Sequence, residues 1–389
     1  MGFVPAACCD AMDRTRIPPK MQPQVRDFKP YTAGLSVEDI QARYQLNRVI
    51  KLSSNENPLG MSPLVQRSIQ RYAALGFRYP RAGSPKLNQA LADFYSLPQD
   101  RLLVCNGSDE AIDLLIRVLA RPGKDHLLVC DPCFSMYQLQ AKLCGVAVRR
   151  VPLNPDFSFP WETLLSRVDD ATALVFITNP DNPSGFAAVK DEILKFAEQL
   201  PASCYLVLDE AYIEFADAPE QYTPLQEWQS LPQQNLIILR TFSKMYGLAG
   251  LRVGYGILPP EVREYLLRVK SPFSVNLLAE QAALTALQDQ DFTRLTGETV
   301  QQGRSYLSRE LNRLGCRVYP SQANFIMFQP PGSALELFEA LLQRGIILRP
   351  LTSYGLDDCL RVSIGTMPEN QALIQAMEAI ENLKSNIED

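Results

Sequence analysis

Apolar runs of strand length alternate with amphipathic segments through the middle of the chain. The strands carry apolar residues on both faces, and the segments between them carry apolar residues at helical spacing. In chain order, the predicted strands are 102–105, 126–130, 146–151, 173–178 and 205–208, and the predicted helices between them are 111–119, 134–143, 161–168 and 190–200. Buried strands joined by helices indicate an α/β fold in which a mostly parallel sheet is flanked by helices. Ligands bind such sheets beyond the carboxyl ends of the strands.

A second alternating region follows a long helical stretch at 274–287 and 292–314. Its predicted strands are 317–319, 324–328, 346–349 and 360–364, and its predicted helices are 334–344 and 368–382. With 389 residues the chain is too long for one hydrophobic core, so two domains are expected. We therefore expect a disordered N-terminal tail at 1–24, an arm at 25–57, a large domain at 58–275 and a smaller α/β C-terminal domain at 276–389.

The composition is that of an ordinary soluble globular enzyme, with 46% hydrophobic and 21% charged residues. The net charge is −5, and Lys and Arg are scattered rather than clustered, which argues against a nucleic-acid or anionic-membrane partner. There is no apolar run of about 18 residues, so no membrane span is expected. The apolar patch at 3–9 is too short for a secretory signal and has no basic flank. A cytoplasmic location is expected.

Nine cysteines stand at irregular spacing, several of them inside apolar runs, and are expected to be reduced thiols. Cys130 and Cys133 form a Cys-x-x-Cys pair, but a zinc site needs a second pair at matching spacing, and the sequence has none. A single histidine, His126, argues against a histidine-based triad or metal cluster; beside Asp125 at a strand start, it is expected at the surface. No metal site is predicted.

Lys244 stands just beyond the predicted strand 235–239. A lysine at the mouth of a buried strand is costly unless its amine has a chemical role, and one such role is a Schiff base with a carbonyl compound. Thr241, Ser243 and Arg252 are donors that suit a phosphate, the arginine through its planar guanidinium. A lysine with phosphate donors describes a pyridoxal phosphate site. For a bare Ser-Lys pair, however, a solvated turn lysine is the more common explanation.

Three further polar motifs follow predicted strands. Ser108 and Asp109 open a helix, where free backbone N–H groups bind anions, although both residue types are also ordinary helix N-caps. Asn182 lies in a stiff turn with the sequence Asn-Pro-Asp-Asn-Pro-Ser-Gly. Asp209 comes directly after an apolar strand, where a carboxylate needs a cationic partner such as a pyridinium nitrogen. The alternative is that Asp209 caps a helix.

Arg349 and Arg361 lie at the ends of two strands in the predicted second domain. A buried arginine without an acidic neighbour in sequence suits a bidentate contact with a carboxylate or a phosphate. For either arginine taken alone, a structural ion pair is the alternative.

The segment from Ser243 to Gly254 reads Ser-Lys-x-x-x-Leu-Ala-Gly-x-Arg-x-Gly. It resembles the lysine region of fold-type I aminotransferases, and most closely that of the histidinol-phosphate aminotransferase family. From about Tyr31 to the C-terminus, eight separated motifs match this family in the same order. The resemblance implies a pyridoxal phosphate cofactor on Lys244, held by the large domain. It also implies a homodimer with the active sites at the interface.

The resemblance implies a role for each matched residue near the cofactor. The turn with Ser108 and Asp109 would hold the cofactor phosphate. Asp209 would contact the ring nitrogen, while Asn182 and Tyr212 would contact the 3-oxygen.

Four other matches are implied to bind the ring, the phosphate or the substrate. Phe134 takes the place of the family's tyrosine that stacks on the ring, so the aromatic face is kept and the hydrogen bond from a phenol is lost. Arg349 and Arg361 would bind substrate anions together with Asn182. Tyr31 would belong to an arm over the substrate, and Tyr79 would reach across the dimer to the cofactor phosphate.

The implied reaction converts L-histidinol phosphate and 2-oxoglutarate to imidazole-acetol phosphate and L-glutamate in histidine biosynthesis, with Lys244 and Asp209 as catalytic residues. An aromatic amino acid aminotransferase or a threonine-phosphate decarboxylase shares the scaffold, and a few pocket side chains decide between them. A silent regulatory module fused to a DNA-binding domain is the alternative from another class. Against it, the N-terminal extension is too short and not basic enough for a helix-turn-helix.

Overall fold

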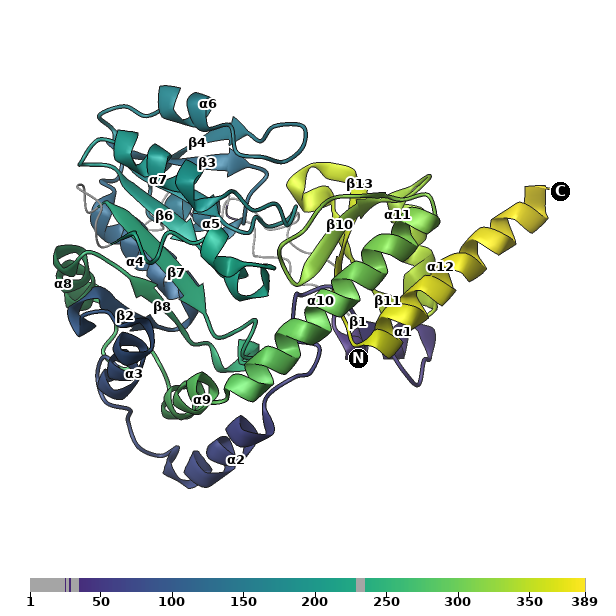
Figure 1. Cartoon of the computed structure of the whole chain (residues 1–389), viewed down its shortest axis with the longest axis horizontal. Coiled ribbons are helices and arrows are strands. Elements are labelled where there is room, and N and C mark those ends of the chain that lie inside the picture. The colour runs from purple at the N-terminus through teal and green to yellow at the C-terminus, as the bar shows by residue number, and fades with distance from the viewer. Residues whose placement is uncertain (1–24, 26–27, 29–34, 229–234, 389) are drawn as a thin grey trace, which may run out of the picture. The chain divides into compact units, whose positions relative to one another are not determined.

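The structure is a computed structural model and describes Val25, Phe28 and residues 35–228 and 235–388 (Figure 1). The expected tail at 1–24 and Tyr31 lie outside the described residues.

Seven strands in the described part of the chain form one sheet, in the order β2-β8-β7-β6-β5-β3-β4 (Figure 1). Their bounds are β2 (Leu102–Cys105), β3 (His126–Asp131), β4 (Ala147–Pro152), β5 (Thr172–Thr178), β6 (Tyr205–Asp209), β7 (Leu236–Thr241) and β8 (Gly254–Ile257). Neighbouring strands from β7 to β4 are parallel, whereas β8 is antiparallel to both β2 and β7. The prediction of a mostly parallel sheet is confirmed. β8 is the exception because residues 242–253 form turns rather than a crossover helix.

The seven-stranded sheet buries side chains on both faces, because successive residues of a strand point to opposite sides. Leu127 and Val207 lie in one apolar cluster, which also contains side chains of α4, α5 and α8. Their chain neighbours Leu128 and Leu208 lie in the other cluster, with side chains of α7, α9 and α10. The polar turns at the strand ends are thus fixed to a sheet that is covered on both sides.

Several α-helices of the described residues begin at recognisable sequence signals. Ser36, Ser62, Asn276, Asp289 and Ser333 cap their helices by accepting a backbone N–H, and proline occupies the first turn of α2, α3 and α8. None of these helices is both long and apolar enough to cross a membrane. The bounds are α1 (Val37–Tyr44), α2 (Pro63–Tyr72), α3 (Pro85–Tyr95), α4 (Gly107–Leu119), α5 (Met136–Leu143), α6 (Trp161–Ser166), α7 (Lys190–Gln199), α8 (Pro260–Val269), α9 (Leu277–Gln288), α10 (Gln290–Arg313), α11 (Ala334–Gln343) and α12 (Met367–Glu388).

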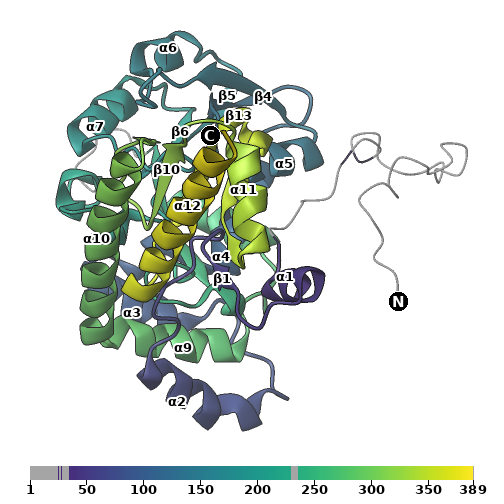
Figure 2. The same ribbon diagram turned by 90° about the vertical axis from the view of Figure 1, so that its right-hand side faces the viewer.

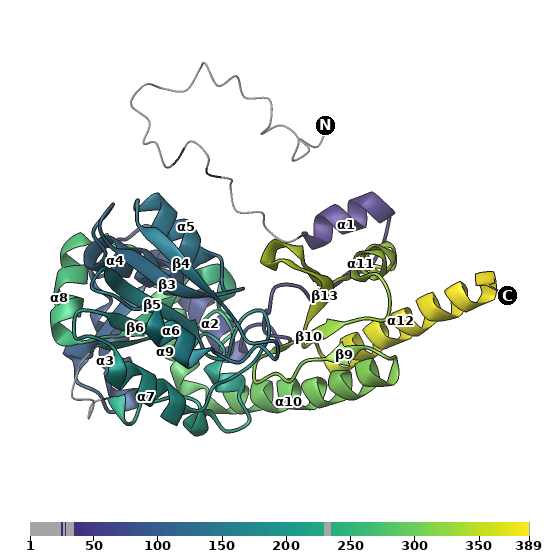
Figure 3. The ribbon, with the colours of Figure 1, turned by 90° about the horizontal axis from the view of Figure 1, so that it is seen from above.

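A second, antiparallel sheet lies in the C-terminal part of the described chain, in the order β12-β13-β10-β9. Its strands are β9 (Arg317–Val318), β10 (Phe325–Gln329), β12 (Arg349–Leu351) and β13 (Leu356–Ser363). Figure 3 shows β10 and β13 between α11 and α10, and both helices contact the sheet. The third helix, α12, packs against both α10 and α11 (Figure 2).

The prediction of one strand at 346–349 is wrong. β11 (Ile346–Ile347) pairs in parallel with β1 (Ile50–Lys51), whereas β12 begins at Arg349 and belongs to the four-stranded sheet. β12 contains Pro350, which has no backbone N–H to donate. This is tolerated because β12 lies at the edge of its sheet. The chain therefore changes sheets at this point, and Arg349 enters the same sheet as Arg361.

The expectation that His126 lies at the surface is also wrong. His126 is 4% exposed, and its Nε2 lies 2.9 Å from Thr172 Oγ1. It is the first residue of β3, which lies between β5 and β4, so neighbouring strands cover it. Burial lowers the pKa of its imidazole. Polar residues at the start of a strand suggested exposure to solvent, but β3 is an inner strand of the sheet, so His126 is covered.

Candidate active site

The turns that follow β2, β5, β6 and β7 carry most of the predicted site residues. These strands run in the same direction, so their carboxyl ends lie at the same edge of the sheet. Asp109 and Asn182 follow β2 and β5, Asp209 ends β6, and Lys244 follows β7. The contacts among these turns define the candidate site.

Lys244 lies in a tight turn between β7 and β8, and its side chain points back toward the N-terminal part of the chain. Its Nζ donates a hydrogen bond of 3.2 Å to the backbone carbonyl oxygen of Ser54 and stands 5.6 Å from the ring centroid of Tyr212. Burial lowers the pKa of the amine to about 8, and the charge of Arg361 adds to that effect. An amine with this pKa is partly uncharged near neutral pH, which is the form that attacks a carbonyl carbon.

Asp209 is a buried carboxylate, 3% exposed, at the carboxyl end of β6. Its Oδ2 accepts a hydrogen bond of 2.9 Å from the Tyr137 hydroxyl, and its Oδ1 accepts one of 3.2 Å from the Ala211 N–H. No cationic side chain within the described ranges pairs with it, and burial raises its pKa to about 6. A buried carboxylate with this environment suits a cationic group that the chain itself does not provide.

Tyr137 was not among the predicted site residues, although it stands only three positions after Phe134. Its hydroxyl bonds to Thr178 Oγ1 at 2.7 Å as well as to Asp209, and its ring is fully buried against Phe176. Phe134 stands edge-on to Tyr137, with ring centroids 5.6 Å apart. A spacing of three residues at a helix start was the available sequence signal, since it places two aromatic rings on one face.

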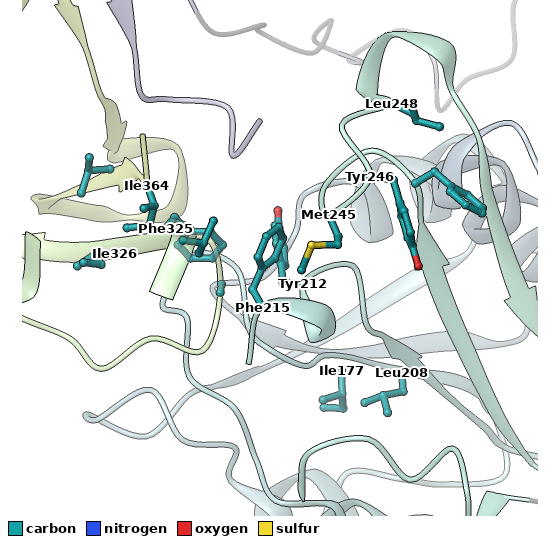
Figure 4. Close-up of a cluster of buried hydrophobic side chains, with 14 of the residues drawn as sticks. Ile177, Leu208, Tyr212, Phe215, Met245, Tyr246, Leu248, Phe325, Ile326 and Ile364 are labelled. Carbon is teal, nitrogen blue, oxygen red and sulfur yellow. The ribbon is translucent and has the colours of Figure 1, made fainter. Parts of the chain in front are cut away.

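Asn182, Tyr212 and Arg361 form a hydrogen-bonded chain between the two sheets. Arg361 Nη1 donates to Asn182 Oδ1, and Asn182 Nδ2 lies 3.5 Å from the Tyr212 hydroxyl oxygen. The Tyr212 ring packs edge-on against Phe325 of β10, with ring centroids 5.1 Å apart. Figure 4 shows the two side chains beside each other. Burial raises the pKa of the Tyr212 phenol to about 12, so the hydroxyl keeps its proton at physiological pH.

Three consecutive residues in the N-terminal part of the protein, 53–55, extend this network of hydrogen bonds, and no motif in the sequence singled them out. The carbonyl oxygen of Ser53 accepts from Arg361 Nη2 at 3.1 Å, and that of Ser54 accepts from Lys244. Asn55 donates from Nδ2 to the Tyr212 oxygen at 3.2 Å. Their contacts are distant in sequence, so a turn-rich composition alone could not reveal them.

The first turn of α4 and the segment around Arg252 form a cradle of donors. Arg252 Nη2 lies 3.1 Å from Asp109 Oδ2, and its Nη1 donates to Ser243 Oγ at 3.3 Å. The residue before α4 is Asn106, and its side chain does not cap the helix. The reading of Ser108 or Asp109 as the N-cap is therefore wrong, because Asn106 holds that position. Glu110 accepts the Asn106 N–H at 2.5 Å, and the N–H groups of the first helical turn, which no capping side chain accepts, suit an anion.

Two glycines keep this cradle open. A Cβ on Gly107 would lie 2.6 Å from Arg252 Nη2, and a Cβ on Gly254 would lie 2.7 Å from the backbone nitrogen of Ser108. Thr241 is buried close by, and its Oγ1 accepts the Ser243 N–H at 3.1 Å. The cradle thus fits a phosphate in shape and in its supply of donors.

The side chains of Tyr79 and Arg349 make no hydrogen bond or ion pair with this cluster among the described residues. Tyr79 is 82% exposed and stacks on Phe273 with centroids 5.0 Å apart. Arg349 is half-buried and lies directly opposite Arg361 in the antiparallel pairing of β12 and β13. Residues so paired point to the same face of a sheet, so Arg349 approaches the site through Arg361.

The described residues hold no group of three or more His, Cys, Asp or Glu that could bind a metal ion. Cys130 and Cys133 are buried free thiols, and burial raises the pKa of both. A hollow of about 610 Å³, lined by residues that include Asp217, Arg304 and Met367, contains none of the predicted site residues.

Comparison with known proteins bears on this cluster directly. Residues 47–377 match the family model described as aminotransferase class I and II. This chain belongs to that family. Its relatives include the histidinol-phosphate aminotransferase of Nitratidesulfovibrio vulgaris (strain Hildenborough), 51% identical over 93% of this chain and 97% of the relative. That of Symbiobacterium thermophilum is 40% identical over 91% and 97%.

Solved structures of similar fold include two enzymes of the same name. The histidinol-phosphate aminotransferase of Clostridium acetobutylicum has a TM-score of 0.79 and 27% identity, covering 86% of this chain and 99% of that one. That of Sinorhizobium meliloti, solved in complex with pyridoxal-5'-phosphate, has a TM-score of 0.83 and 24% identity, covering 94% and 100%. Class I and II aminotransferases use pyridoxal phosphate, so this aminotransferase is a pyridoxal phosphate-dependent transaminase.

Proposed function

We propose that this aminotransferase moves the amino group of L-histidinol phosphate to 2-oxoglutarate, giving imidazole-acetol phosphate and L-glutamate in histidine biosynthesis. The observation that carries the proposal is the 51% identity to a histidinol-phosphate aminotransferase across nearly the full length of both chains. At that identity the fold, the cluster at the strand ends and the two arginines of the second sheet are expected to be shared.

Seven residues of this chain would hold the aldehyde carbon, the ring nitrogen and the phosphate of the cofactor. The Lys244 amine would hold its aldehyde carbon, and the Asp209 carboxylate would pair with its ring nitrogen. The start of α4, with Ser108 and Asp109, would bind its phosphate together with Thr241, Ser243 and Arg252. The fit is supported by the unpaired buried carboxylate and by the cradle that a Cβ on Gly107 or Gly254 would fill.

The bound cofactor would supply an electron sink that stabilises the carbanion left when a substrate α-carbon loses its proton. Lys244 would take that proton on Nζ as the general base, for which a pKa of about 8 is well matched. Asn182 and Tyr212 would orient the ring through its 3-oxygen, and Phe134 would cover one face of it. Asp209 would keep the ring nitrogen protonated.

Arg349 and Arg361 would bind the phosphate of one substrate and the carboxylates of the other. Two guanidinium groups on the same face of adjacent strands repel each other unless an anion lies between them or beside them. Arg361 also contacts Asn182, so an anion on this arginine would lie close to the reacting centre. Tyr31 would cover the substrate from the arm.

The proposal includes a homodimer in which Tyr79 reaches the cofactor phosphate of the partner subunit. It is supported by exposed aromatic residues near Tyr79, since Phe77 is 77% exposed and Phe273 is 45% exposed. We also propose that residues 58–275 and 276–389 form the large and small domains, which the separate seven-stranded and four-stranded sheets support. A cytoplasmic location is part of the same proposal.

A substrate panel tests the specificity. Purified enzyme with pyridoxal phosphate and 2-oxoglutarate is given histidinol phosphate, phenylalanine or threonine phosphate, and glutamate and carbon dioxide are measured. We expect glutamate to form fastest with histidinol phosphate. Faster turnover with phenylalanine would assign an aromatic aminotransferase, and carbon dioxide from threonine phosphate would assign a decarboxylase. A Lys244→Ala variant should lose turnover and the cofactor that borohydride fixes to the chain.

A further inference from the structure

Asn55 has an unusual backbone conformation, and both ends of its side-chain amide make hydrogen bonds. It is 1% exposed, and its φ of 54° lies in the left-handed region, which asparagine tolerates better than most residues. Its backbone N–H donates to Ser363 Oγ at 2.8 Å, and its carbonyl oxygen accepts from Asn324 Nδ2 at 3.0 Å. The residue is therefore held from both sides by the second sheet and the segment before it.

Ser363 fixes which end of the Asn55 amide faces Tyr212. The Ser363 oxygen accepts from the Asn55 N–H, so its single proton is donated to Asn55 Oδ1, at 3.0 Å. Turning the amide over would leave that buried hydroxyl proton without an acceptor among the described residues, which costs free energy. Nδ2 is thus the end that faces Tyr212, and it is a donor.

Arg361 fixes the Asn182 amide in the same way. A guanidinium can only donate, so the atom of Asn182 that faces Arg361 is the oxygen, and its Nδ2 faces Tyr212. Two amide donors therefore approach the Tyr212 oxygen, Asn55 at 3.2 Å and Asn182 at 3.5 Å. A phenol oxygen has two acceptor positions and one proton, so both acceptor positions are occupied.

The Tyr212 proton has no acceptor among the described residues, and it must be donated to a group that the chain does not supply. We propose that Asn55 is a positioning residue that, held by Ser363, keeps the Tyr212 hydroxyl as a hydrogen-bond donor toward the 3-oxygen of the cofactor. This inference rests on the proposed function, because that function places the cofactor oxygen beside Tyr212. Asn55 does not touch the reacting atoms and acts through Tyr212.

The test is a pH titration of the visible absorbance of the full-length, cofactor-loaded enzyme. A donated hydrogen bond stabilises the anionic 3-oxygen, so it lowers the pH at which the chromophore loses its proton. Asn55→Gly removes the amide while keeping a residue that accepts the left-handed backbone. We expect it to raise the titration midpoint by about half a pH unit to one pH unit, the equivalent of one neutral hydrogen bond.

Two further changes, Asn55→Asp and a Tyr212→Phe background, test whether Asn55 acts on the chromophore through the Tyr212 hydroxyl. Aspartate keeps the shape and the backbone but presents an acceptor, so the Tyr212 proton turns away from the cofactor and the midpoint rises further. In the Tyr212→Phe background the shift caused by Asn55→Gly should vanish, and the shift caused by Asn55→Asp should shrink to the effect of its charge. Thermal unfolding of the cofactor-free variants measures any purely structural cost separately.

Each outcome decides the inference. Equal shifts with and without the Tyr212 hydroxyl, or an unshifted midpoint in both Asn55 variants, would overturn it. If Asn55→Gly does not fold, Ser363→Ala releases the amide instead and should raise the midpoint less than Asn55→Asp does. A wild-type enzyme without any visible chromophore would instead contradict the proposed function.

Discussion

The amine of Lys244 donates a hydrogen bond of 3.2 Å to the carbonyl oxygen of Ser54, a residue 190 positions earlier in the chain. A neutral carbonyl orients an amine but does not compensate its charge as a carboxylate does. The amine is therefore held in place while burial keeps its pKa at about 8. Orientation and a depressed pKa are the two properties that a lysine needs for covalent and proton-transfer chemistry.

The depressed pKa of Lys244 predicts a pH-dependent stability of the cofactor-free protein. In the unfolded chain the amine has its ordinary pKa of 10.5, so between about pH 8 and 10.5 the unfolded state binds more protons than the folded state. Stability then rises with pH across this window, and the buried charge destabilises the protein below it. Lys244→Met should raise the unfolding midpoint at pH 7, and the gain should shrink as the pH approaches 10.5.

Lys244→Arg is the matched control for that measurement. Arginine keeps its proton in both the folded and the unfolded state across the same window. The stability of Lys244→Arg should therefore lack the rise with pH that the wild type shows through Lys244. Thermal unfolding of the three proteins at several pH values provides the comparison. A difference between Lys244→Met and wild type that stays constant from pH 7 to 10.5 would contradict the assigned pKa.

The raised pKa of Asp209 predicts a dependence of stability on pH that is opposite to that of Lys244. Its carboxyl has an ordinary pKa of 3.8 and a folded value of about 6, so between these values the folded state binds more protons. Stability of the cofactor-free protein therefore falls as the pH rises through this window. Asp209→Asn should stabilise the cofactor-free protein at pH 8 by on the order of 2–3 kcal/mol, and the gain should fade toward pH 4.

Binding of the cofactor should make the wild type more stable than Asp209→Asn, the reverse of the order without cofactor. With pyridoxal phosphate bound, the ring nitrogen gives Asp209 its cationic partner, so the wild type gains more stability on loading than Asp209→Asn. Turnover of the variant should fall about 100-fold, which corresponds to about 2.7 kcal/mol of transition-state stabilisation. Unfolding midpoints with and without cofactor measure the first effect. Equal gains on loading would remove Asp209 from the ring nitrogen.

The sequence was sufficient for the elements whose signals are local. Apolar runs predicted the strands of the large sheet, and turn chemistry placed Asp209, Asn182 and Lys244 at strand ends. The structure places all three at the same edge, because parallel strands end together. Each of these inferences needs only the residues within one turn or strand.

The features that the sequence did not reveal depend on contacts between distant segments. Asn55 meets Tyr212 and Ser363 across 157 and 308 positions, and nothing in the turn-rich segment around it identifies those partners. The split of 346–349 likewise depends on pairing with β1. His126 is buried because β4 and β5 flank its strand, which the order of strands along the chain does not specify.

The two arginines of the second sheet predict different spectroscopic consequences. Lysine keeps the charge but loses the planar fork, so Arg361→Lys and Arg349→Lys should each raise the KM for histidinol phosphate about tenfold, the loss of about 1.4 kcal/mol. Arg361 donates to Asn182 through Nη1 and to the Ser53 carbonyl oxygen through Nη2, and the single nitrogen of a lysine cannot replace both atoms of this fork. Arg349 has no such contact among the described residues. Only Arg361→Lys should therefore shift the pH midpoint of the cofactor absorbance. A shift of equal size in Arg349→Lys would contradict this division.

Tyr79 predicts that active sites are shared between subunits. The residue is 82% exposed and contacts Phe273 rather than the cluster around Lys244, so within its own subunit it is not joined to the cofactor site.

Tyr79→Ala should weaken cofactor retention, and Lys244→Ala should abolish turnover, in the separate proteins. If Tyr79 serves the partner subunit, mixed dimers of the two variants contain one intact site each. Random exchange of subunits makes half of the dimers mixed, so activity at limiting cofactor should recover to about a quarter of the wild-type value. Recovery requires that the two residues act in the same site from different chains, because a site built within one subunit would stay defective in every mixed dimer.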